Sequence, residues 1–136
     1  MRQRFSIILI LVTSFVAGVF ASPKREMRNA WVATVYALDW PNSWGGGTAN
    51  TEKQKTELIA LIDSLHAANF NGLSLQVRSW SDAMYNSKYE PWSQYLTGTR
   101  GGVPQYDPLQ LAVEEAHKRG MELHVWINPR SEEHTS

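Results

Sequence analysis

Three short strand-like segments alternate with two helix-like segments, and this order constrains the fold more than any other feature of the sequence. Residues 29–38, 71–78 and 122–129 are rich in the β-branched, aromatic and aliphatic residues typical of strands. Between them, apolar residues at helical spacing predict helices over 51–69 and 108–119. Strand, helix, strand, helix, strand predicts two right-handed crossovers and three parallel strands.

Capping residues mark the ends of both predicted helices. Thr51 and Gln54 have the spacing of a capping box, and Asn69 can adopt the left-handed conformation that ends a helix. Asp107 stands directly before a proline, which predicts the start of the second helix, and Gly120 predicts its end. On its outer side, two pairs have the i,i+4 spacing of ion pairs: Glu114 with Lys118 and Glu115 with Arg119.

The second and third predicted strands alternate aliphatic and polar residues. The polar phase consists of Ser74, Gln76, Arg78, His124, Trp126 and Asn128. A doubly wound sheet buries both faces of its central strands, so those strands read as aliphatic runs. A polar phase instead favours the interior of a (β/α) barrel near the carboxyl ends of its strands. Because eight strands need about 250 residues, we predict an α/β fold: the first three strands and two helices of a truncated (β/α)8 TIM-type barrel.

Both ends of the chain are expected to lie outside the barrel. Residues 1–21 have the form of a signal peptide, with Arg2 and Arg4, an apolar run over 5–20 and a predicted cleavage after Ala21. That run is shorter than the roughly 20 residues that span a bilayer, so no stable span is expected after cleavage; an uncleaved anchor is the alternative. The signal predicts a secreted, periplasmic or cell-envelope protein. Residues 130–136, RSEEHTS, read like a translated sequencing adapter, which leaves 22–129 as the barrel part.

Composition excludes several classes of function. The 13 basic and 13 acidic residues balance, so no charge footprint indicates nucleic acid. The absence of cysteine excludes disulfides, thiolate metal sites and cysteine nucleophiles. His124 has no partner at metal-ligand spacing and is expected to be a hydrogen-bonded interior residue. We expect no cofactor and no metal, and an uncharged or weakly charged substrate.

Both predicted strand-to-helix connections are long and aromatic, and function in β/α barrels lies on that side. Aromatic side chains stack on apolar faces of a ligand, while planar polar groups pair with its hydroxyls. Each aromatic residue could equally serve core packing. The candidate substrate-binding residues are Asp39, Trp40, Gln76, Arg78, Asp82, Tyr85, Trp92, Trp126 and Asn128.

Hydrolysis by acid–base catalysis often uses a pair of carboxyl groups. Asp39 and Asp82 lie in the predicted mouth loops, but each has a structural alternative. Asp39 precedes a Trp-Pro turn that it could cap, and Asp82 follows Arg78 at a spacing that allows an ion pair. No catalytic residue is therefore assigned.

Three long motifs resemble one known family: NAWVATVYALDWP (29–41), NGLSLQVRSWSDAMYNSKYEPWSQYLTG (71–98) and YDPLQLAVEEAHKRGMELHVWINP (106–129). They are similar to the amino-terminal third of the glycosyl hydrolase-like family 10 proteins, although Ala30 and Asn69 stand near positions where that family tends to have glycine. The resemblance implies a bacterial, secreted or envelope-associated (β/α)8 barrel that hydrolyses polysaccharide, with peptidoglycan glycan strands favoured. It also implies that the main catalytic carboxylates lie on later strands, so this fragment alone is expected to be inactive. The alternative is a non-catalytic carbohydrate-binding barrel.

Overall fold

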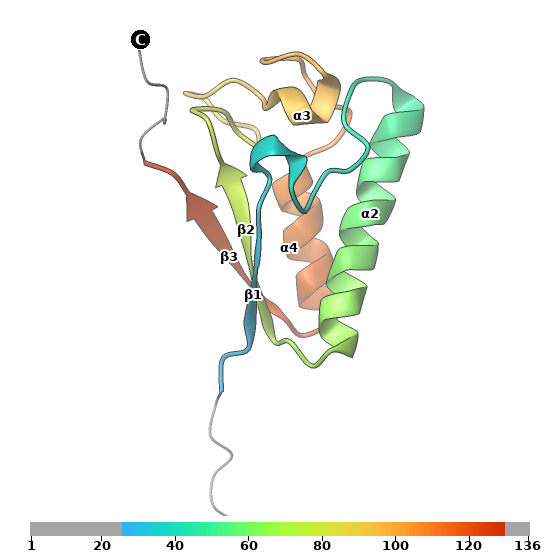
Figure 1. The fold of residues 1–136 in the computed structure, drawn as a ribbon, viewed down its shortest axis with the longest axis vertical. Helices are drawn as coiled ribbons and strands as arrows, with labels where there is room; N and C mark the ends of the chain where they lie inside the picture. Colours follow the sequence, from blue (N-terminus) through green and yellow to red (C-terminus); the bar gives the residue numbers. More distant parts are fainter. Residues whose placement is uncertain (1–25, 130–136) are drawn as a thin grey trace, which may run out of the picture.

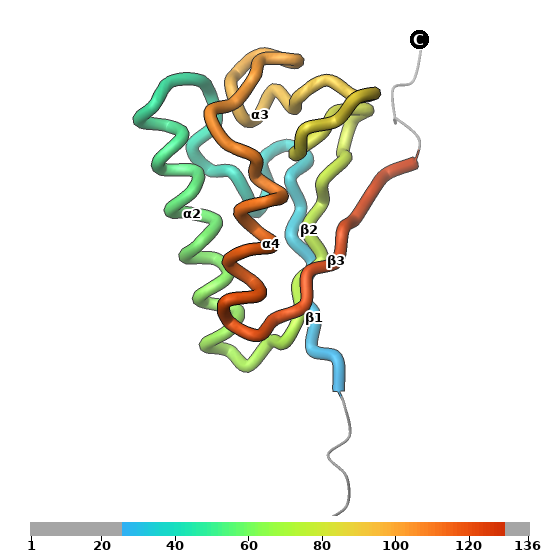
Figure 2. The backbone as a smooth tube through the Cα atoms, turned by 180° about the vertical axis from the view of Figure 1, so that it is seen from behind, coloured from blue at the N-terminus to red at the C-terminus, as the bar shows by residue number. Residues whose placement is uncertain are grey.

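The computed structural model describes residues 26–129, so the predictions for 1–21 and 130–136 lie outside the described residues. Three strands form a parallel sheet in the order β1-β2-β3, with α2 and α4 on one face (Figure 1). The view from behind shows the same layering (Figure 2). The elements are β1 (Asn29–Val32), η1 (Val35–Ala37), α2 (Thr48–Ala67), β2 (Gly72–Arg78), α3 (Gln94–Thr97), α4 (Pro108–Lys118) and β3 (Glu122–Ile127). The predicted α/β class and the three parallel strands of a partial barrel are confirmed.

The first strand is shorter than predicted. β1 ends at Val32, and the chain then turns through η1. Tyr36 and Ala37 have φ values of 55° and 52°, a left-handed conformation that cannot continue a strand. The backbone N–H of Asp39 donates to the carbonyl of Ala33 at 3.1 Å, which closes the turn. The β-branched and aromatic composition of 33–38 predicted a strand, but tertiary contacts of this segment override that preference.

The first long helix starts earlier than predicted and without the predicted capping box. α2 begins at Thr48, and the N–H of Thr51 already donates to the carbonyl of Gly47 at 3.0 Å. Gln54 is fully buried and its Nε2 donates to the carbonyls of Ser43 at 2.7 Å and Leu96 at 3.1 Å. Gln54 therefore joins α2 to the loop at Ser43 and to α3 instead of capping its helix.

The end of α2 and the start of α4 follow the prediction. Asn69 has a φ of 63°, as expected for a left-handed residue after the helix. The Oδ1 of Asp107 accepts a hydrogen bond from the N–H of Gln110 at 3.0 Å, and Pro108 occupies the first turn of α4. Gly120, with a φ of 68°, allows the sharp turn from α4 into β3.

A charged network joins the two long helices. The Nε of Arg119 donates to Oδ1 of Asp63 on α2 at 2.6 Å, and its Nη1 donates to Oε2 of Glu115 at 2.7 Å. Lys118 Nζ donates to the other oxygen of Glu115 at 2.6 Å. The predicted pair of Glu115 with Arg119 is present, while Glu114 accepts from a glutamine of the same helix and not from Lys118. Hydrogen bonds from Lys118 and Arg119 hold the pKa of the Glu115 carboxyl below its usual value.

This lowered pKa predicts a pH-dependent effect of Glu115→Gln. A carboxyl whose pKa is lower in the folded state stabilises the fold above its unfolded pKa of about 4.3, and this contribution is lost as the pH falls through the folded value. We expect the variant to lose about 1 kcal/mol of unfolding free energy at pH 7 and progressively less below pH 4 or so. Urea unfolding across this range measures the difference, with Glu114→Gln as the control. A deficit that does not change with pH would contradict the network.

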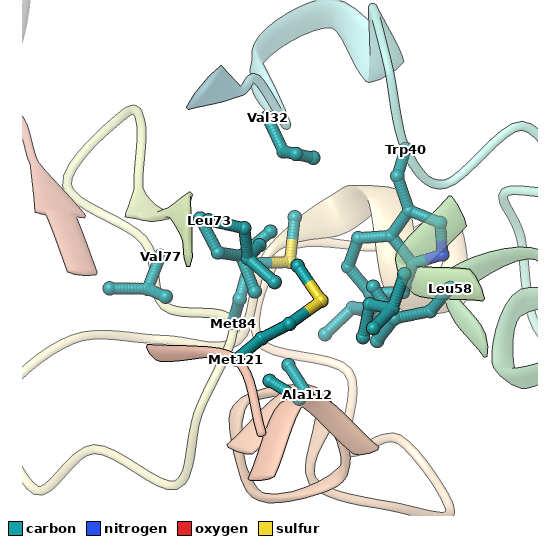
Figure 3. Packing of buried hydrophobic residues seen from close by; sticks show 12 residues of the cluster. Val32, Trp40, Leu58, Leu73, Val77, Met84, Ala112 and Met121 are labelled. Carbon is teal, nitrogen blue, oxygen red and sulfur yellow. The ribbon is translucent and has the colours of Figure 1, made fainter. Parts of the chain in front are cut away.

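The core lies between the sheet and the two helices. The aliphatic phase of β2, Leu73, Leu75 and Val77, points into it, as predicted, and none of these side chains is more than 1% exposed. Figure 3 shows the indole of Trp40 beside Leu58, within the same cluster. Within residues 26–129 no helix is both long and apolar enough to cross a membrane. No described helix covers the other face of the sheet, which carries the polar phase, although the turn over 33–38 buries Gln76 of β2.

Candidate functional site

The helix-free face of the sheet carries two tryptophans in contact. In the strand register Trp31 lies opposite Ser74, and Trp126 lies opposite Gln76, so both indoles flank β2. Their ring centroids are 5.1 Å apart at an angle of 59°, and Trp31 is 68% exposed. We call Trp31 and Trp126 the tryptophan pair. Trp31 was not among the predicted site residues, although its alternation with the aliphatic Val32 was a signal that could have placed it on this face.

Asn128 lies beside the tryptophan pair at the carboxyl end of the sheet. The indole Nε1 of Trp126 donates to Oδ1 of Asn128 at 2.8 Å. The Nδ2 of Asn128 in turn donates to the carbonyl of Ser79 at 3.2 Å. The structure thus brings together two of the predicted site residues, with the amide already oriented by its neighbours.

Arg78, the last residue of β2, pairs with Glu90 and not with Asp82 as the spacing had suggested. Its Nε and Nη2 donate to Oε1 of Glu90 at 3.0 and 2.6 Å, and its Nη1 donates to the carbonyl of Asn128. The side chains of Arg78 and Glu90 are 16% and 24% exposed. This partly buried pair fastens the long connection between β2 and α4 to the end of the sheet. Glu90 was missed because no local periodicity relates it to Arg78.

The two aspartates of the predicted mouth bind backbone groups. Asp82 is 4% exposed, and its Oδ1 accepts from the N–H of Ser79 at 3.3 Å and of Trp80 at 2.9 Å. The Oδ2 of Asp39 accepts from the N–H of Ala33 at 2.7 Å, so this residue closes its own turn. The turn-capping alternative holds for Asp39, and Asp82 plays the equivalent role after β2.

Two of the predicted substrate-binding residues, Trp40 and Gln76, are fully buried in the described part of the chain. Trp40 has no exposed surface and its Nε1 donates to the carbonyl of Gln54 at 3.0 Å. Gln76 is also fully buried, and its Oε1 accepts from the backbone N–H groups of Thr34 and Val35, both at 2.9 Å. Both side chains hold the fold together and neither reaches a surface where a ligand could bind.

The remaining predicted residues lie nearer the surface. Tyr85 and Trp92 are partly buried against the core, and an isolated β-bridge between Ala83 and Trp92 holds two parts of the connection together.

His124 is exposed beside Glu122 at 3.4 Å, so its expected interior position is wrong. Among residues 26–129 no three His, Cys, Asp or Glu side chains are grouped as a metal site would require.

These features define a class: an α/β protein with the first strands of a β/α barrel, whose helix-free face presents aromatic and amide side chains. The family model described as glycosyl hydrolase-like 10 matches residues 26–134. The chain belongs to the glycosyl hydrolase-like 10 family, which confirms the resemblance seen in the sequence.

Two curated relatives share 41% of their aligned residues with this chain. One is "Glycosyl hydrolase YngK" of Bacillus subtilis (strain 168), aligned over 129 residues, 93% of this chain and 25% of the relative. The other is "Glycosyl hydrolase DigH" of Escherichia coli (strain K12), aligned over 109 residues, 77% of this chain and 25% of the relative. The chain therefore spans about a quarter of the length of these relatives.

Proposed function

We propose that the full-length protein is a glycosidase that hydrolyses O-glycosyl bonds of a polysaccharide. The observation that carries this proposal is the tryptophan pair, next to the oriented amide of Asn128, at the carboxyl ends of β1 and β3 in a glycosyl hydrolase-like chain. Indole faces suit the apolar faces of sugar rings, and an amide suits their hydroxyls. This part of the protein would form one wall of the substrate cleft.

The acid and base of the reaction are proposed to come from parts of the protein beyond this chain. Hydrolysis of a glycosidic bond needs one protonated and one ionised carboxyl group, placed across the bond. Asp39 and Asp82 bind backbone N–H groups, and Glu90 pairs with Arg78. These three carboxylates therefore stabilise loops, and we expect the chain on its own to be inactive.

The proposed substrate is a cell-envelope glycan, with the glycan strands of peptidoglycan favoured. Residues 1–21 have the form of a signal that would carry the protein across the membrane to such material. We accordingly propose a secreted, periplasmic or cell-envelope location in a bacterium.

A carbohydrate-binding barrel without catalysis is the second candidate. It is favoured by the engagement of Asp39, Asp82 and Glu90 in structural contacts, because the described cleft wall offers binding groups without a spare pair of carboxylates. The two candidates differ in one outcome. An enzyme releases new reducing ends from glycan strands, whereas a binding barrel retains affinity and releases none.

Trp31→Ala in the full-length protein tests the position of the cleft. Removing one stacking indole should weaken glycan binding about tenfold, since an aromatic contact of this kind is worth on the order of 1–2 kcal/mol. Calorimetric titration with solubilised glycan strands measures affinity, and a reducing-end assay measures turnover. Tyr89→Ala is the matched control, because Tyr89 is 93% exposed and lies outside the tryptophan pair. Equal affinities of the Trp31→Ala variant and the unaltered protein would place the cleft elsewhere.

A further inference from the structure

The long connection between β2 and α4 encloses a small pocket of its own. The pocket has a volume of about 160 Å³ and is lined by Trp80, Asp82, Gln94, Tyr95 and Arg100. Its lining belongs to the segment after β2 and to α3, which lies near the carboxyl ends of the strands (Figure 1). Because its lining shares no residue with the tryptophan pair, it is a separate feature of the same end of the molecule.

Contacts within the protein fix the walls of this pocket. The ring of Tyr36 meets the ring of Trp80 edge-on, with centroids 5.3 Å apart at 83°. The backbone N–H of Tyr36 donates to the hydroxyl of Tyr95 at 3.0 Å. Across the pocket, Nη2 of Arg100 donates to the carbonyl of Ser81 at 2.9 Å. A pocket held in this way is preformed, as ligand sites usually are.

The lining combines aromatic rings with polar groups of both kinds. Asp82 uses Oδ1 for its backbone contacts, and a carboxylate has a second oxygen that can also accept hydrogen bonds. The amide of the exposed Gln94 can donate and accept. The two charged groups of the lining, Asp82 and Arg100, have opposite signs, which favours an uncharged ligand with many hydroxyls.

The volume matches one six-membered ring. A cavity of about 150 Å³ holds a benzene molecule, so a pocket of about 160 Å³ that is open on one side takes a single ring, with its substituents reaching the solvent, and not a disaccharide. We propose that this pocket binds one sugar unit of the glycan, as a subsite distinct from the tryptophan pair. The proposal rests on the proposed function, which makes carbohydrate the ligand class.

Gln94→Leu in the full-length protein tests the subsite, because it keeps the side-chain size and removes the amide. The probes are chitotetraose, cellotetraose and glycan strands released from peptidoglycan, titrated by calorimetry. Loss of one hydrogen bond should weaken binding about three- to tenfold, and Trp80→Ala should weaken it tenfold or more, on the order of a lost aromatic contact. Gln105→Leu is the matched control, since Gln105 is an exposed glutamine of the same connection outside the pocket.

The outcomes distinguish a failure of the subsite proposal from a failure of the proposed carbohydrate function. Weaker binding by both pocket variants, with unchanged binding by Gln105→Leu, supports the subsite. If the unaltered protein binds a probe and Gln94→Leu binds it equally well, the subsite is wrong while the carbohydrate function stands. If the unaltered protein binds none of the three probes, both proposals fail. Thermal unfolding shows whether Trp80→Ala folds; where it does not, the Gln94→Leu result decides.

Discussion

Trp40→Ala is expected to lower the free energy of unfolding by about 3–5 kcal/mol, the usual cost of truncating a fully buried tryptophan. The side chain has no exposed surface and packs in the cluster that joins β1, β2, α2 and α4. Its indole also donates to the carbonyl of Gln54 on α2, so the variant loses packing and a hydrogen bond at once. A loss of this size is a large fraction of the roughly 5–15 kcal/mol that stabilises a typical domain.

Urea unfolding measures the effect, and two further variants isolate its cause. Trp44→Ala is the matched control, because Trp44 belongs to the same loop and is 58% exposed; its loss should stay within about 0.5 kcal/mol. Trp40→Phe keeps a ring in the core but removes the indole N–H, so it should fall between the other two. Comparable losses in Trp40→Ala and Trp44→Ala would mean that Trp40 does not hold the core.

Those parts of the fold that depend on local signals could be predicted from the sequence. The aliphatic phase of β2, the start of α4 at Asp107 and the left-handed Asn69 all follow from the chemistry of neighbouring residues, and all are present. The predicted capping box is absent because the side chain of Gln54 is buried in the core, where it donates to the carbonyls of Ser43 and Leu96. No local sequence pattern predicts hydrogen bonds between residues so far apart in the chain.

The candidate site was harder to predict, because alternation tells which face a side chain occupies but not what covers that face. Gln76 lies in the polar phase of β2, yet the turn at Thr34 folds over it and buries it. Arg78 was expected to pair with the nearby Asp82, but Glu90 reaches it from a loop without periodicity. By contrast Trp126 and Asn128 occupy adjacent polar-phase positions of the predicted third strand, and the structure does bring them together.

Gln76→Leu is the second large effect we expect, a loss of about 3 kcal/mol. The Oε1 of Gln76 is the hydrogen-bond acceptor for the backbone N–H groups of Thr34 and Val35, and Thr34 is itself fully buried. Leucine fills the same space but leaves these donors without a partner, and each unsatisfied buried group costs about 1–3 kcal/mol. Urea unfolding gives the total loss, and hydrogen exchange at Thr34 and Val35 locates it.

Gln76→Glu distinguishes the lost acceptor from a general disturbance of the core. Glutamate has nearly the same shape and keeps an oxygen for the two backbone donors, so its loss should be smaller than that of leucine despite the cost of burying a carboxyl. We expect Gln76→Leu to disturb the proposed subsite as well. The turn at Thr34 and Val35 is followed directly by Tyr36, which contacts Trp80 and Tyr95. If Gln76→Leu left hydrogen exchange in the turn unchanged, the amide would not be what positions Tyr36. Faster hydrogen exchange in the turn and weaker glycan binding in Gln76→Leu, with neither change in Gln76→Glu, would show that the buried side chain of Gln76 links β2 to the proposed subsite.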